Sequence, residues 1–406
     1  MRLQKAKGVQ YAAVPSSLVP VDTLLDRVEK TVSLGVCELC CRLGLAGGSM
    51  ARSVENLFHA AGLRMGEELF RQIIEEEGKA VVAAAQAEQL PIEWFAKDAL
   101  TLTPEGQEVS RIYASADGVM APMTTQAEKD KRRQTVQKQR EAKPRKRGVK
   151  RQRLRAVKKG SDQRYKQIYL TMMYGQDKQK HKLVSVTRGN HEAMGRMLAR
   201  DARVLRLPAA QEKVGLVDGA VCLRRNLEGL TLTAIGLDFF HLSEHVHGDY
   251  LACGDPILSA GGSDGIKRGS VAESMSCGTP EQGGGTSDWV SDVLATVKHQ
   301  GYIPFWEKLV DWRNSLKGHR RKKADKLLHY VAQRQDMIAY KEFIAKGWDI
   351  GTGPMESMCK ATTRRIKGPG MRWDSQNAES LMAMEALYQS NLWKLWWDRK
   401  HLKIAA

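Results

Sequence analysis

Apolar side chains recur at helical spacing in the first quarter of the chain. Between residues 20 and 108 this pattern predicts helices, two of which cover 49–62 and 66–77. Two short helices joined by a tight link have the dimensions of a helix-turn-helix DNA-binding unit, although any pair of packed helices gives the same pattern. We therefore expect 1–108 to be a helical region, with a candidate helix-turn-helix at 49–77.

The middle of the chain changes to short apolar runs that are typical of strands. One predicted strand leads into Asp117-Gly118 and a later one leads into Asp218-Gly219. Strands, then a helix, then further strands indicate an α/β fold. The predicted strands are 111–116, 165–174, 181–187, 213–217 and 230–235, and the predicted helix is 190–205.

The last third returns to a helical pattern after an irregular stretch. Residues 252–288 hold many Gly and Ser residues without periodicity, which indicates a loop. Residues 289–346 are again helical in pattern. The final block, 351–397, opens with Gly-Thr-Gly-Pro and continues as a long helical pattern.

Positive charge is concentrated in one segment. The 406 residues include 64 Lys and Arg against 46 Asp and Glu, and 129–159 alone carries sixteen basic and two acidic residues. With few large apolar residues it cannot bury a core, so we expect a mobile arm. Its charge density suits a polyphosphate, because each neutralised phosphate releases a counterion; a solvated loop or a localisation tag is the alternative. The arm residues expected to contact DNA are Arg132, Arg133, Arg145, Lys146, Arg147, Lys150 and Arg151.

Composition argues against several other classes. No run of 18 apolar residues is present, so a membrane-spanning helix is not expected, and residues 1–13 lack the apolar segment of a secretory signal. The seven cysteines are odd in number and widely spread. They favour a reducing compartment over a disulfide framework.

Three acidic residues are candidates for chemistry. Asp117 and Asp218 each follow a predicted strand, and carboxylates there lie at a sheet edge, where α/β proteins build sites. Asp-Gly is also a common turn dipeptide, so either could be only a turn. Glu356 falls in the first turn of a predicted helix, where an acid is favoured by the helix dipole. An acid followed by cations on one helix face suits a metal held beside a phosphate backbone, and an ordinary charged surface helix fits as well. These cations are Lys360, Arg364 and Lys367.

Two other strings have metal-ligand character. His241 and His245 would lie one helical turn apart and suit zinc, with Glu244 as a base and a third ligand such as Glu307. The C-x-x-C-C string at 37–41 is half of a zinc site without a second cysteine pair. We expect those cysteines to be small buried apolar residues.

Taken in order, these motifs resemble the insertion-sequence transposases of the DDE class, in the branch related to Mutator-like elements. The D-x-x-H string between the second Asp and the Glu is a signature of that branch, and the similarity covers about 111–388. The motifs that carry it are Ala116-Asp117-Gly118, Val217-Asp218-Gly219, Leu237-Asp238-Phe-Phe-His241-Leu-Ser-Glu-His245, Gly351-Thr-Gly-Pro-Met-Glu356-Ser and the run from Arg364 to Trp373.

The resemblance implies an RNase H-like catalytic core and two-metal phosphoryl transfer with Mg²⁺ or Mn²⁺. Asp117 would be the shared metal ligand, with Asp218 and Glu356 completing the two shells, and Asp238 and His241 would be auxiliary. The implied partners are double-stranded DNA, as transposon terminal inverted repeats and target, and further copies of the chain in a dimer or higher oligomer. The implied location is the prokaryotic cytoplasm, in association with the nucleoid.

The same resemblance divides the chain. Residues 1–108 precede the core, 109–250 form its first part with the arm at 129–159, and 251–288 form a Gly/Ser-rich loop. A helical insertion follows at 289–347, then the last core part with the Glu helix at 348–390, and a tail at 391–406. The 252–288 stretch departs from the helical sequence expected of the family. An inactive remnant that only binds DNA is therefore the alternative function.

Overall fold

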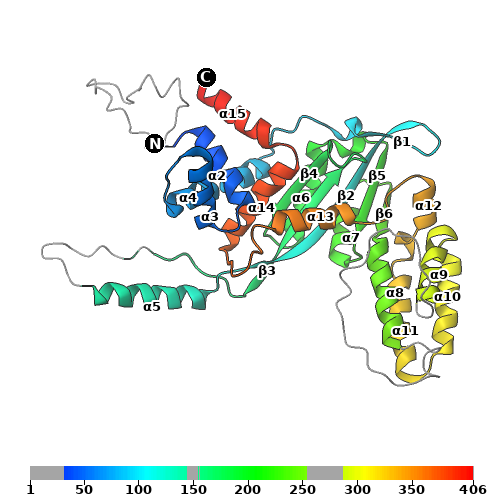
Figure 1. Cartoon of the computed structure of the whole chain (residues 1–406). Helices are drawn as coiled ribbons and strands as arrows, with labels where there is room; N and C mark the ends of the chain where they lie inside the picture. The colour runs from blue at the N-terminus through cyan, green and yellow to red at the C-terminus, as the bar shows by residue number, and fades with distance from the viewer. Residues whose placement is uncertain (1–31, 144–153, 155, 254–286, 406) are drawn as a thin grey trace.

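A computed structural model describes residues 32–143, 154, 156–253 and 287–405 (Figure 1). The strands are β1 (Leu100–Leu102), β2 (Glu108–Pro122), β3 (Tyr165–Tyr174), β4 (Lys182–Thr187), β5 (Glu212–Val217) and β6 (Ala234–Leu237). The α-helices are α2 (Leu34–Ala46), α3 (Met50–Ala61), α4 (Glu67–Gln86), α5 (Gln126–Ala142), α6 (His191–Val204), α7 (Val221–Glu228), α8 (Phe239–Cys253), α9 (Ser287–His299), α10 (Tyr302–Ser315), α11 (Gly318–Ala332), α12 (Tyr340–Ala345), α13 (Gly353–Thr363), α14 (Ser375–Gln389) and α15 (Trp393–Ala405). The described ranges also contain the 3₁₀ turns η1 (Ala96–Asp98), η2 (Leu207–Ala209) and η4 (Gln335–Met337).

A mixed sheet forms the centre of the fold, which confirms the predicted α/β class. Its strand order is β4-β3-β2-β5-β6, and β1 pairs with the start of β2. β2 is antiparallel to β3 and parallel to β5, and β5 is parallel to β6. Residues 110–116 of β2 are all buried, as expected for a central strand that is covered on both faces.

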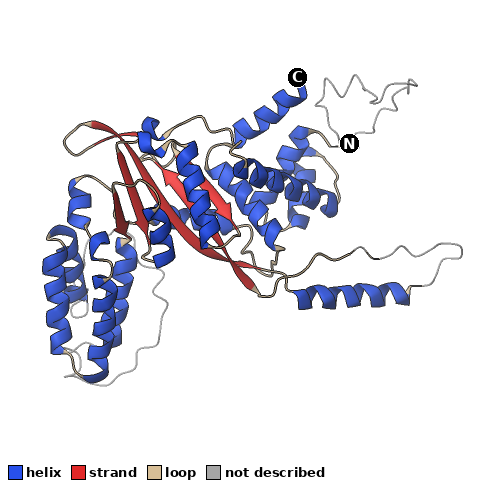
Figure 2. Cartoon of the chain, turned by 180° about the vertical axis from the view of Figure 1, so that it is seen from behind, coloured by secondary structure: helices blue, strands red, loops and turns tan. Residues whose placement is uncertain are grey.

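Helices cover both faces of the sheet (Figure 2). Asp117 of β2 pairs with Leu170 of β3, so Asp117 and the next β3 residue, Thr171, point to opposite faces. The Thr171 hydroxyl lies 3.3 Å from Asp201 of α6, whereas the Cys359 thiol of α13 lies 3.3 Å from Asp117. Helices α6 and α7 therefore cover one face, and α13 with α14 covers the other.

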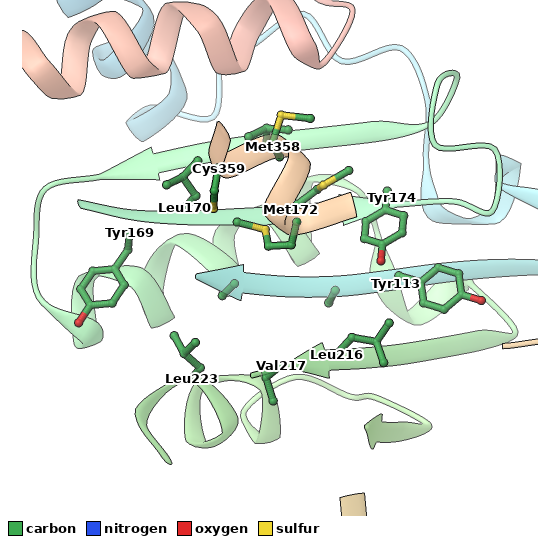
Figure 3. Packing of buried hydrophobic residues seen from close by; sticks show 14 of the residues in the cluster. Tyr113, Tyr169, Leu170, Met172, Tyr174, Leu216, Val217, Leu223, Met358 and Cys359 are labelled. Atoms are coloured by element: carbon green, nitrogen blue, oxygen red, sulfur yellow. The ribbon is translucent and has the colours of Figure 1, made fainter. Parts of the chain in front are cut away.

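The α13 face is packed mainly by sulfur-containing and aliphatic side chains. Figure 3 shows Met358 and Cys359 of α13 beside Leu170 and Met172 of β3. All four are less than 10 % exposed, at 6, 7, 0 and 2 % respectively. This packing fixes α13 against the centre of the sheet.

The N-terminal helices pack on the C-terminal ones. Gly78 of α4 lies against Ser380 of α14, where a Cβ would come 2.6 Å from the Ser380 carbonyl oxygen, so glycine permits this close helix approach. Glu77 of α4 accepts hydrogen bonds from Trp396 (2.6 Å) and from Lys400 (2.5 Å), both on α15. The segment 391–406, expected as a tail, thus contains a packed helix.

Helices α8 to α11 form a bundle at the other end of the sheet (Figure 1). Tyr250 of α8 stacks on Trp289 of α9 at 4.7 Å, and Trp289 packs against Trp312 of α10 at 5.2 Å. The predicted helical character of 289–346 is confirmed, and α8 joins it. Within the described ranges, no helix is long and apolar enough to cross a membrane.

Several predicted element bounds differ from the structure. The strand at 111–116 extends to Pro122, because β3 continues to pair with it, and β1 adds a strand to 1–108. The strand predicted at 230–235 lies instead at Ala234–Leu237. The long helical pattern from 351 breaks between α13 and α14, in a stretch where Gly370 adopts φ +73°.

Part of the basic arm is an α-helix, a regular element that the sequence pattern did not predict there. A capping box between Thr125 and Glu128 starts α5, and an ion pair joins Glu128 to Arg372. Side-chain hydrogen bonds four residues apart, such as Gln137 to Glu141, support it. No residue of α5 is buried, as its charge pattern predicted.

Candidate active site

Three aspartates form a row across neighbouring strands. The parallel pairing of β2 and β5 joins Ser115 to Leu216, and that of β5 and β6 joins Val217 to Leu237. Continued by one or two residues, these registers place Asp117 beside Asp218 and Asp218 beside Asp238. The Asp238 amide also donates to the Val217 carbonyl at 2.7 Å. The row therefore follows from strand register, with neighbours about 4.8 Å apart along the sheet.

Asp117 lies inside β2 and does not end it, which corrects its predicted place at a strand end. The next residue, Gly118, meets the Gln167 side chain so closely that a Cβ would come 2.0 Å from its amide nitrogen. Asp218 does follow the last residue of β5, as predicted. Its Oδ1 accepts a 2.9 Å hydrogen bond from the Ala220 amide.

Glu356 reaches the row because the segment before its helix is fixed along the sheet. The buried Arg111 guanidinium donates to the Gly347 carbonyl at 2.7 Å and to the Lys346 carbonyl at 3.0 Å. The Asp349 amide donates to the Tyr113 hydroxyl at 3.0 Å. These contacts bring the start of α13 to the end of the sheet at which the aspartates lie.

A pocket of about 170 Å³ joins these residues. It contains all three predicted catalytic acids and both predicted auxiliary residues, so the structure brings these five residues together. The lining residues are Ala116, Asp117, Asp218, Asp238, His241, Thr352, Met355 and Glu356.

Asp238 differs from the other acids in its burial and its partners. It is 2 % exposed, and its Oδ1 accepts a 2.8 Å hydrogen bond from the Phe240 amide. Its Oδ2 accepts from the Thr352 hydroxyl. Both oxygens are therefore engaged, and Asp238 acts as an anchor between β6 and the start of α13.

The other carboxylates are more accessible. Glu356 keeps 53 % of its side chain exposed and lies 3.8 Å from the Lys360 amine. Asp117 accepts one hydrogen bond from the Cys359 thiol, and burial together with this carboxylate raises the pKa of that thiol well above its ordinary value. Cys359 was not singled out from the sequence, although it lies three residues after Glu356 on the same helix.

The donor set suits a hard divalent cation. Carboxylate oxygens, water and phosphate oxygens are the ligands that Mg²⁺ prefers, and Asp117, Asp218 and Glu356 supply the first kind. Among the described residues, no group of three or more His, Cys, Asp and Glu side chains is placed around a single ion position.

The histidine pair considered as a zinc site packs through its aromatic rings. His241 and His245 of α8 meet edge-to-face at 4.9 Å, and His245 packs on Tyr330 of α11 at 4.1 Å. Burial, the nearby His241 and the nearby Arg334 lower the pKa of His245. The considered third zinc ligand, Glu307, is an exposed residue of α10, and the described part of the chain groups no three such ligands there.

The C-x-x-C-C string behaves as a packing element. Cys40 and Cys41 are both 0 % exposed on α2. Burial raises the pKa of Cys40 to about 12. The expectation of small buried apolar residues is confirmed for these two.

The predicted cations follow Glu356 along α13 and beyond its end. Lys360 is 82 % exposed on α13, and Arg364 follows at its C-terminal cap. Lys367 lies beyond the end of the helix and lines a separate pocket with Arg164 and Arg372. Those two arginines were missed from the sequence, because only the tertiary structure brings 164 and 372 together.

The arm extends this basic surface. Arg132 and Arg133 lie on α5, which projects from the body of the molecule (Figure 1). The remaining arm residues that we expect to bind DNA lie outside the described residues, as does most of the 251–288 loop. These residues are Arg145, Lys146, Arg147, Lys150 and Arg151.

Comparison with protein-family models gives no match for this chain, and no curated protein matches it.

Proposed function

We propose that this chain is a DNA transposase of the DDE class with an RNase H-like catalytic core. One observation carries the proposal: Asp117, Asp218 and Glu356, spread over more than half of the sequence, line one pocket. The resemblance leads us to expect this arrangement. One acid lies on the central strand, one lies at the end of the neighbouring strand, and one lies on a helix that packs against the sheet.

The reaction would be metal-dependent cleavage at transposon ends, followed by strand transfer to target DNA. Two Mg²⁺ or Mn²⁺ ions would activate the attacking oxygen and stabilise the leaving 3′ oxygen. Asp117 would hold the shared position, with Asp218 and Glu356 at the outer ones. Lys360, Arg364, Lys367 and the arm would contact phosphates, and His241 would contact DNA or orient pocket groups. Attack by the released 3′-OH moves the phosphodiester without ATP.

Synapsis of two ends requires at least two active sites, so we propose a dimer or higher oligomer on DNA in the prokaryotic cytoplasm, associated with the nucleoid. The test is cleavage of a labelled duplex that carries the DNA flanking the gene, in Mg²⁺ or Mn²⁺. Wild-type protein should cleave, and Glu356→Gln should not, while both bind DNA. Glu342→Gln, at an exposed acid of α12 that does not line the pocket, is the control and should cleave.

The second candidate is a DNA-binding remnant without catalysis. It is favoured by the 252–288 stretch, which departs from the helical sequence expected of the family. Binding by the wild-type protein without cleavage in either metal would select it.

Stoichiometric zinc in the purified protein would instead support a zinc site at His241 and His245.

A further inference from the structure

Arg334 joins the helical bundle to the turn that carries Asp218. It lies between α11 and η4, and its guanidinium donates two hydrogen bonds to the Gly219 carbonyl, at 3.1 Å from Nε and 2.7 Å from a terminal nitrogen. The other terminal nitrogen donates to the Tyr330 carbonyl at 3.1 Å, and the guanidinium lies 3.9 Å from the centre of the Tyr330 ring. The arginine is thus held by Tyr330 of α11 while its guanidinium holds the turn.

The turn is shaped to receive this side chain. Gly219 has φ +88°, and a Cβ there would lie 2.8 Å from Arg334 Nε and 2.9 Å from the Tyr330 hydroxyl. A side chain at 219 would therefore displace the Arg334 and Tyr330 side chains from the turn. The Asp218 carboxylate accepts a hydrogen bond from the Ala220 amide, which closes the turn around Gly219. The Gly219 carbonyl and the Asp218 side chain therefore belong to the same turn.

A second route leads from the same helix to the pocket. The Tyr330 ring packs on His245, and His245 packs on His241, which lines the pocket. Arg334 and Tyr330 thus contact two structures that end at the site, the Asp218 turn and helix α8.

We propose that Arg334 is a positioning residue, through which the helical bundle sets the orientation of the Asp218 carboxylate. The effect on catalysis that we expect from this positioning rests on the proposed function. The helical insertion at 289–347 then supports one side of the pocket. A displacement of α11 moves Arg334 and, through it, the Asp218 turn.

The first test measures cleavage against Mg²⁺ concentration for Arg334→Ala, Arg334→Lys and Arg313→Ala. Arg313, paired with Asp325 within the bundle, is the control and should match wild type. Removing a residue that holds a metal ligand in place typically lowers metal affinity or activity by about 10- to 100-fold. Arg334→Ala should therefore need about tenfold more Mg²⁺ at unchanged DNA affinity, and added guanidinium should restore activity. An unchanged Mg²⁺ requirement, or loss that guanidinium does not restore, overturns the proposal.

The second test needs no activity and so separates this inference from the proposed function. Hydrogen–deuterium exchange of the full chain without DNA or metal should show faster exchange in the peptide covering 217–222 for Arg334→Ala. Arg313→Ala should leave that peptide unchanged. If 217–222 exchanges at the wild-type rate in Arg334→Ala, Arg334 does not hold the turn, whether or not the protein cleaves DNA.

Discussion

The hydroxyl of Thr352 donates a hydrogen bond to the carboxylate of Asp238 across 114 positions of sequence. Both residues are buried, at 6 % and 2 % exposed. The contact ties the end of β6 to the cap of the helix that presents Glu356. It gives the D-x-x-H string of this chain a physical role, in which the Asp locates the Glu helix.

We expect Thr352→Val to destabilise the protein and to impair any cleavage. The valine keeps the shape but leaves a buried carboxylate without its O–H donor, which costs about 1–3 kcal/mol of unfolding free energy. Thr352→Ser retains the donor and should stay near wild type. Urea denaturation of the two variants measures the difference, and equal midpoints would contradict the anchor role.

Arg111 should be among the most sensitive charged residues. It is 1 % exposed, pairs with Glu212 at 2.6 Å and holds the segment before α13. Removing one partner of a buried ion pair costs about 3–5 kcal/mol. Arg111→Ala should therefore lower the unfolding free energy by about that amount. Arg203→Ala, at an exposed ion pair with Glu88, is the matched control and should cost about 1 kcal/mol or less.

Cys359 should resist alkylation in the native protein. Burial and Asp117 raise its pKa, so little thiolate forms at pH 8, and thiolate is the reactive form. Cys222, which is only partly buried, should react with iodoacetamide faster. Peptide mapping after brief labelling tests this order, and urea should equalise the two rates. Faster native labelling at Cys359 would mean that α13 does not cover Asp117 as described.

Protein stability should fall as the solution is acidified below pH 6.5. Burial lowers the pKa of His245 and of His181 from 6.5. A histidine whose pKa is lower in the folded state binds fewer protons there, so the unfolding free energy rises with pH between the folded pKa and 6.5. His241, Asp249, Glu244 and Arg334 surround His245 electrostatically. Thermal melts from pH 5 to 7 should show this rise, and His245→Phe should reduce it.

DNA binding should depend on salt through α5. Replacing Lys131, Arg132, Arg133 and Lys138 with Gln should reduce the slope of log affinity against log salt by up to about 3.6, since each phosphate contact contributes about 0.9. Gln134→Ala with Gln139→Ala, on the same helix, should leave the slope unchanged. Fluorescence anisotropy at about 50 to 300 mM salt, a range that includes the physiological ionic strength, measures this slope. A slope that is the same in all three proteins would rule out phosphate contacts by α5.

Much of the architecture could be predicted because it is encoded locally. The β3, β4 and β5 runs were placed within a residue or two because strands buried on both faces read as short continuous apolar runs. Helix α6 was placed as closely because its one buried face gives a helical period. The extent of β2 was missed because pairing with β3, rather than its own composition, carries it to Pro122. Helix α5 was missed because its support is capping and side-chain pairs on a fully polar surface.

The sequence by itself determined the α/β class, the placement of most elements, the position of the charge and which acids line the pocket. Those properties depend on residue type and short-range spacing. Only the tertiary structure decided that Asp117, Asp218 and Asp238 form one row, and that Arg111 and Thr352 bring Glu356 to it. Strand register and the return of a distant helix depend on contacts between residues far apart in sequence, which no local pattern records.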